Sequence, residues 1–163
     1  MSINIRHHIA HIRQANPDDC WATAVAMVMG RHSSAGVDHV KNLARAHGVT
    51  LNPNGSIPPE AVPRVASAVH LACHDFRSGR RMTLDLLERL MTPSAIALFG
   101  GVNYPSQLSA LNHVLALYQL IGDGRPGDTQ VYFVDPFDGR SIHDDFETFE
   151  GEMVVPDFIL ARR

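Results

Sequence analysis

The sequence predicts an α+β fold in which helices from the first half of the chain pack on an antiparallel sheet formed by the second half. Helix patterns dominate between residues 20 and 91, whereas strand patterns separated by turn residues follow from residue 95 onward. This segregation along the chain favours two packed layers rather than an alternating parallel sheet. A length of 163 residues fits a single domain over residues 1–163.

The stretch up to residue 30 predicts an extended arm followed by a buried helix. Residues 1–13 set isoleucines among polar neighbours, a pattern typical of extended backbone. Alanine and methionine favour a helix over residues 20–29, with Asp18 or Asp19 as the N-cap and Gly30 as the stop. Because nearly every residue of this helix is apolar, we expect it to be buried on most sides.

Three more helices are expected before the strands begin. Gly48 ends the first of them, Pro59 fits the first turn of the second, and Pro93 follows the end of the third. They cover residues 37–46, 59–69 and 83–91, with a loop rich in helix breakers over residues 50–59 and a short strand over residues 69–76 between them.

The second half of the chain predicts strands over residues 96–100, 111–121, 130–135 and within 152–160. The turn-rich residues 122–128 join the second and third of these strands as a hairpin. Pairing across this hairpin brings His113 and Asp135 to one end of the ladder, close enough for an imidazole–carboxylate hydrogen bond. His143, Asp144 and Asp145 are predicted to form a solvated turn.

Composition excludes several classes of function. The net charge of −3 gives no basic footprint for nucleic acid. No apolar run is long enough for a membrane span, and the N-terminal segment lacks the apolar stretch of a cleaved leader. We therefore expect a cytoplasmic protein, or one delivered without a cleaved signal peptide. Two cysteines are too few for a disulfide scaffold, and Cys73 is predicted to be a buried small hydrophobic residue.

The residues at the start of the first helix predict an activated nucleophile. A thiol in the first turn of a helix meets the positive end of the helix dipole and unpaired backbone N–H groups, both of which favour the thiolate. A protonated imidazole beside it strengthens this effect. Gln14 lies six residues before Cys20 across a turn, so its amide can point at the same place as the Cys20 N–H and stabilise an oxyanion.

The motif Gln14-x5-Cys20-Trp21, followed by small and apolar residues, resembles the start of the papain-like fold in bacterial C39-like peptidases and secreted effector proteases. Residues 113–115, 122–124 and 131–136 are similar to the second half of that family. The resemblance implies a buried nucleophile helix packed on a C-terminal antiparallel sheet. It also implies that Gln14 builds the oxyanion hole, Cys20 is the nucleophile, His113 the base and Asp135 the orienting acid. The family commonly has glycine before the histidine, where this chain has Asn112.

The resemblance further implies a thiol protease that hydrolyses an amide bond of a protein or peptide through a thioester, without metal or organic cofactor. A bacterial effector or toxin domain, with an immunity or inhibitor protein as partner, is the corresponding biology. The same triad serves a transglutaminase-like acyl transferase or deamidase and a peptidoglycan amidase. The departure at Asn112 keeps open a fourth reading, a catalytically inactive binding module with the same fold.

Other residues carry weaker expectations. His7 and His11 could share a helix face and bind a metal, but the extended arm favours a surface cluster with His8. Arg77, Arg80 and Arg81 are expected to form a solvated basic loop. The substrate groove is expected to depend on the loops over residues 48–59 and 100–110, whose sequences contain no readable specificity code.

Overall fold

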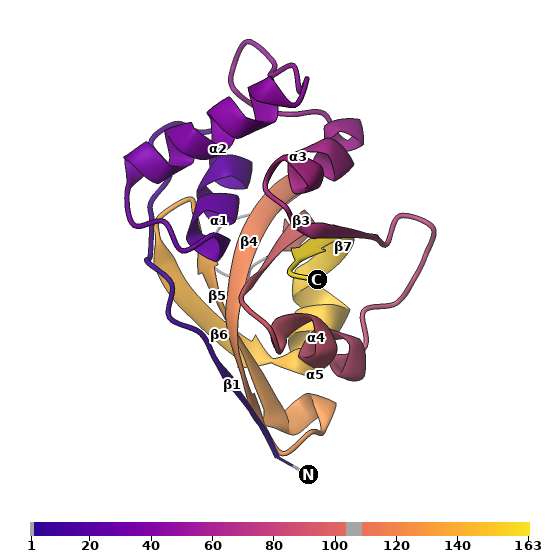
Figure 1. Cartoon of the computed structure of the whole chain (residues 1–163). Helices are drawn as coiled ribbons and strands as arrows, with labels where there is room; N and C mark the ends of the chain where they lie inside the picture. Colours follow the sequence, from indigo (N-terminus) through magenta and orange to yellow (C-terminus); the bar gives the residue numbers. More distant parts are fainter. Residues whose placement is uncertain (1, 104–108) are drawn as a thin grey trace.

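The computed structural model in Figure 1 describes residues 2–103 and 109–163; residues 104–108, part of the loop predicted over 100–110, lie outside it. Over the described residues it is an α+β fold with one antiparallel sheet of seven strands, as the sequence predicts for the fold class. The strand order is β2-β7-β3-β4-β5-β6, and β1 pairs with β4. The strands are β1 (Ile3–Arg6), β2 (Ala72–Asp75), β3 (Ile96–Asn103), β4 (Ser109–Gly122), β5 (Thr129–Asp135), β6 (Arg140–Asp145) and β7 (Val154–Ala161).

The helices begin and end largely where the sequence pattern predicts. Thr83 caps α4 by accepting a hydrogen bond from the Leu86 N–H at 3.2 Å. Gly30 and Gly48 follow α1 and α2 with φ of +78° and +82°, a region in which glycine is favoured. The α-helices are α1 (Cys20–Val28), α2 (Ser34–Ala46), α3 (Val62–Ala68), α4 (Leu84–Met91) and α5 (Phe146–Thr148). Short 3₁₀ turns cover Pro59–Ala61 and Pro126–Asp128, and a π turn covers Phe149–Met153.

The prediction of two layers is wrong, because helices cover both faces of the sheet. Alternate residues of the central strands point to opposite sides, and each side has its own core. On one side Val114 and Ala116 of β4 pack under α1, α2 and α3, which lie together in Figure 1. On the other side Leu115 and Leu117 pack under α4 and the turns that follow β6. The unbroken apolar runs of β3 and β4 reflect this two-sided burial.

Two local predictions also need correction. Helix α2 begins at Ser34 rather than at residue 37, three residues earlier than predicted. The predicted solvated turn at His143, Asp144 and Asp145 is instead the edge strand β6, with His143 opposite Tyr132 and Asp145 capping α5. Stacking of His143 on the Tyr132 ring, with centroids 4.7 Å apart, and the ladder to β5 outweigh the polar character of the segment.

The long hairpin of β4 and β5 forms as predicted and sets the positions of the site residues. The register pairs Ala116 with Val134, so one further step places Asp135 opposite Leu115 and makes His113 its diagonal neighbour. On the other side of β4, His113 pairs with Gly100 of β3, and the register shifts immediately beyond this pair. Such bulges commonly re-aim side chains next to functional sites.

Candidate active site

Gln14, Cys20 and His113 line one cleft of about 540 Å³, and Asp135 lies buried behind His113. The cleft lies between the start of α1 and the end of the sheet at which β5 terminates. The structure thus brings together all four residues that the sequence singled out, although Gln14 and Asp135 are 121 residues apart in the chain. Convergence of this kind from distant segments is what nucleophilic catalysis by cysteine requires.

Helix α1 holds Cys20 at its first residue, half-exposed, while every residue from Trp21 to Val28 is buried. Asp19 occupies the N-cap position, as one of the two predicted candidates, but its side chain makes no capping hydrogen bond. The first N–H groups of α1 therefore receive no acceptor from the cap residue. They remain available to a negative charge at the helix start.

The Asp19 carboxylate binds other partners instead. Its Oδ1 accepts from Lys41 Nζ of α2 at 2.5 Å, and its Oδ2 accepts from Asn16 Nδ2 at 3.1 Å. Lys41 is the only lysine in the sequence, and both side chains of the pair are largely buried. Lys41 cancels a negative charge next to Cys20 that would otherwise oppose a thiolate there. The pair also anchors the loop from Gln14 to Cys20 on α2.

We expect replacement of Lys41 with methionine to destabilise the fold by about 3–5 kcal/mol, because it leaves the buried Asp19 carboxylate without its counter-charge. Urea unfolding followed by circular dichroism measures the loss. The double variant Asp19→Asn/Lys41→Met should regain most of it, and Arg45→Met, an exposed change on the same helix, should cost little. If Lys41→Met is as stable as the wild type, the Asp19–Lys41 pair has no structural role.

His113 and Asp135 form a buried pair at the back of the cleft. His113 Nε2 and Asp135 Oδ1 lie 2.7 Å apart, and the two side chains are 7% and 5% exposed. The same Oδ1 accepts from the Phe137 N–H at 2.9 Å, and the Asp135 carbonyl accepts from the Gly139 N–H at 2.8 Å. The turn after β5 therefore fixes the carboxylate, and the carboxylate fixes the imidazole.

The environment of His113 favours the protonated ring. Burial opposes the charge, but hydrogen bonds to Asp135 and to the Cys20 side chain, with the coulombic attraction of both groups, raise the pKa of His113 to about 9. Since Nε2 faces Asp135, the other ring nitrogen, Nδ1, is the one left for the sulfur. A cationic imidazole lies next to Cys20 at neutral pH.

Gln14 is attached to both sides of the site. Its backbone N–H donates to the Pro136 carbonyl at 2.6 Å, which joins the loop before α1 to the turn after β5. One N–H of its side-chain amide donates to the Pro17 carbonyl at 2.8 Å, so the second N–H is left over. The amide oxygen is buried and has no hydrogen-bond partner among the described residues. The Gln14 amide is therefore held in place by one hydrogen bond, while its oxygen and its second N–H are not used by it.

The walls of the cleft come from segments that the sequence could only partly identify. Trp21 is 2% exposed, lines the cleft and donates from Nε1 to the Gly55 carbonyl at 3.0 Å, which attaches the loop over residues 50–59 to α1. Asn112, the departure from the family pattern, is exposed and lines the cleft beside His113. Phe137 also lines the cleft, with 57% of its surface exposed.

The remaining sequence candidates lie away from the cleft. Cys73 is a free, half-buried thiol on β2, and burial, together with nearby Asp75, raises its pKa to about 11. His7 binds the Met91 carbonyl at 2.6 Å, and His11 contacts the Tyr118 ring, so they do not share a helix face. Across residues 2–103 and 109–163, no group of three or more His, Cys, Asp or Glu side chains is arranged to hold a metal ion.

Arg77, Arg80 and Arg81 of the predicted basic loop are all exposed, as expected, although two of them form ion pairs. Arg77 forms a bidentate pair with Asp75 and lies over the Phe158 ring, and Arg81 pairs with Glu150. Sequence reasoning missed Lys41 and Asp157. A lone lysine was a signal for the first, whereas Asp157 enters the cleft through a strand irregularity that has no sequence signature.

Comparison with known proteins found no family model that matches the chain and no match among curated proteins. In the described part of the chain, no helix has both the length and the apolar character needed to cross a bilayer.

Proposed function

We propose that this protein is a cysteine hydrolase of papain-like type that cleaves an amide bond of a protein or peptide. The observation that carries the proposal is the convergence of Cys20, at the N-terminus of a buried helix, with the buried His113–Asp135 pair in one cleft. The free second N–H of the Gln14 amide supports the same chemistry. A bacterial effector or toxin role agrees with the resemblance in the sequence and belongs to the same proposal.

In the proposed reaction, Cys20 gives its proton to Nδ1 of His113, and the sulfur then carries the negative charge beside a cationic ring. The Asp135 carboxylate stabilises that ring through Nε2–H. The free N–H groups at the start of α1 add a partial positive charge on the other side of the sulfur. A helix start and a neighbouring cationic imidazole both favour the thiolate over the thiol.

The thiolate attacks the carbonyl carbon of the substrate, a C–S bond forms, and the carbonyl electron pair moves to oxygen. The Cys20 N–H and the free Gln14 N–H donate to this oxyanion. When the oxyanion collapses, the C–N bond breaks and His113 protonates the leaving amine. His113 then takes a proton from water, the hydroxide attacks the thioester, and the sulfur leaves as thiolate.

Alkylation with iodoacetamide tests the proposal, with Cys73 as the internal control. At about pH 6 we expect Cys20 to react on the order of 100-fold faster than Cys73, because only Cys20 has a cationic imidazole and a helix start beside it. Peptide mapping by mass spectrometry measures the two rates in the folded protein. The alkylated protein should also lose the ability to cleave a library of cellular peptides prepared with a glutamate-specific protease.

Two results would contradict the proposal. The first is a Cys20 thiol that resists alkylation until the protein unfolds. The second is peptide cleavage that persists unchanged after Cys20 has been alkylated completely.

A further inference from the structure

Asp157 lies on β7 at a β-bulge that faces the candidate active site. Phe158 pairs with Phe99 of β3, whereas Pro156 pairs with Gly100, so Asp157 is the extra residue between two paired ones. A bulge of this kind turns a side chain away from the alternation of the strand. Asp157 consequently lines the cleft together with Gly100 and His113, the residue that pairs with Gly100 on the other side.

Gly100 makes this arrangement possible. A Cβ added to Gly100 would lie 2.1 Å from the Val155 carbonyl oxygen and 3.0 Å from the Pro156 Cα. Both are backbone atoms, which cannot move aside cheaply. The bulge that presents Asp157 therefore depends on a glycine in the strand between Asp157 and His113.

The Asp157 carboxylate is half-buried and has no salt bridge within the described part of the chain. Burial raises its pKa; Arg77 acts in the opposite direction, and Asp75 adds to the increase. Arg77 is already held by both oxygens of Asp75, with its guanidinium 4.5 Å from the centre of the Phe158 ring. Asp157 is thus a partly desolvated acid whose nearest cation is engaged elsewhere.

Apart from His113, the charged side chains that line the cleft are acidic, like Asp157. Asp18 also lines the cleft, and no lysine or arginine stands among its described lining residues. The cationic His113 is balanced by Asp135 behind it. Low-dielectric walls with one sign of charge concentrate the field and attract the opposite charge. A positively charged group that enters the cleft can therefore bind Asp157 without displacing another cation.

We infer that the cleft selects a substrate with a lysine or arginine side chain near the scissile bond, and that Asp157 binds that side chain. This inference rests on the proposed function. Strands lie about 4.8 Å apart, so β7 is about 10 Å from β4 across β3. An extended peptide advances about 3.3–3.6 Å per residue, which places the basic residue within three positions of the bond that is cleaved.

The experiment is cleavage of the same glutamate-specific peptide library, which leaves lysine and arginine uncut. We expect lysine and arginine to be enriched about tenfold at one position within three residues of the cleaved bonds, the range of a charge-assisted hydrogen bond. Asp157→Asn should remove the enrichment at that position, and Asp157→Lys should replace it with a preference for Asp. Added salt should also reduce the enrichment of lysine and arginine seen with the wild type.

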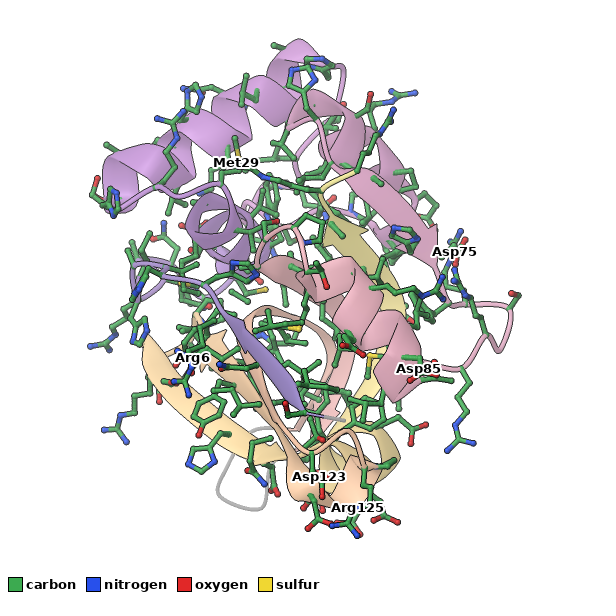
Figure 2. The ribbon with its side chains drawn as sticks, turned by 60° about the horizontal axis from the view of Figure 1, so that its bottom comes forward. Arg6, Met29, Asp75, Asp85, Asp123 and Arg125 are labelled. Carbon is green, nitrogen blue, oxygen red and sulfur yellow. The ribbon has the colours of Figure 1, made fainter. Side chains whose placement is uncertain are left out.

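Asp85→Asn is the matched control, because Asp85 lies near the start of α4 (Figure 2), is exposed and is not among the residues that line the cleft. It should leave the enrichment unchanged, and equal thermal unfolding midpoints would show that all variants fold. Cys20-dependent cleavage without basic enrichment, or with enrichment that survives Asp157→Asn, overturns the inference and leaves the proposed function intact. No Cys20-dependent cleavage at all overturns the proposed function and the inference with it.

Discussion

Replacing Cys20 with alanine is expected to lower the rate of peptide hydrolysis on the order of 10⁶-fold, which is the effect of removing the nucleophile of a hydrolase whose catalytic residues act as a unit. The reason is chemical, since without the sulfur no thioester can form and the cleft can only bind. The change removes a half-exposed side chain at the first residue of α1, so the fold should remain intact. The measurement is kcat/KM for the best peptide from the library.

Cys73→Ala is the control for this result. Cys73 is the other cysteine of the chain, lies on β2 outside the cleft and has a pKa raised to about 11 by burial and by nearby Asp75. Its replacement should leave hydrolysis unchanged. Full activity of Cys20→Ala would end the nucleophile assignment. A Cys20-dependent mass increase at glutamine residues, without new peptide termini, would instead favour the deamidase alternative.

The parts of the fold that the sequence predicts are those governed by local chemistry. Gly30 and Gly48 end helices because they adopt positive φ, and the turn residues from 122 to 128 join β4 to β5. The predicted β4–β5 hairpin is sufficient to place His113 and Asp135 at the same end of the ladder. The predicted start of α1 is sufficient to identify Cys20 as a candidate nucleophile. These features need only nearest neighbours in sequence or across one turn.

The features that the sequence did not predict depend on long-range packing. Asp19 looks like a capping residue, but Lys41 of α2 competes for its carboxylate. The segment at His143 is polar enough for a loop, but pairing with β5 makes it a strand. Asp157 follows a proline in an apolar segment, and only the register shift against β3 turns it toward the cleft. Lys41 is 22 residues from Asp19, Gly100 is 57 residues from Asp157, and even His143 and its partner Tyr132 are 11 residues apart.

His113→Gln should reduce hydrolysis by at least about 10⁴-fold and should change how the reaction depends on pH. In the wild type the cationic imidazole favours the thiolate, so Cys20 should still react with iodoacetamide at about pH 6. Glutamine cannot accept the proton. The thiolate then loses its cationic partner, and alkylation at about pH 6 should fall on the order of 100-fold.

The fall of kcat/KM at alkaline pH, here called the alkaline limb, provides an independent test of the role of His113. Burial disfavours the charged ring, but Asp135 and Cys20 raise the pKa of His113 to about 9, so the general acid should be lost, and kcat/KM should fall, as pH rises through about 9. The folded-state pKa lies above the unfolded value of about 6.5. The ring's contribution to stability is therefore fully present below pH of about 6.5 and disappears as pH rises through about 9.

Asp135→Asn keeps the shape of the pair but removes the negative charge, so the alkaline limb should move to lower pH by at least about one unit. Asp138→Asn, a change at an exposed acid in the same turn, should leave the limb where it is. NMR titration of the His113 ring in the wild type and both variants measures the shift directly. A His113 ring that titrates below neutral pH in the wild type would show that Asp135 does not stabilise its charge, and the ion-pair mechanism would then have to be abandoned.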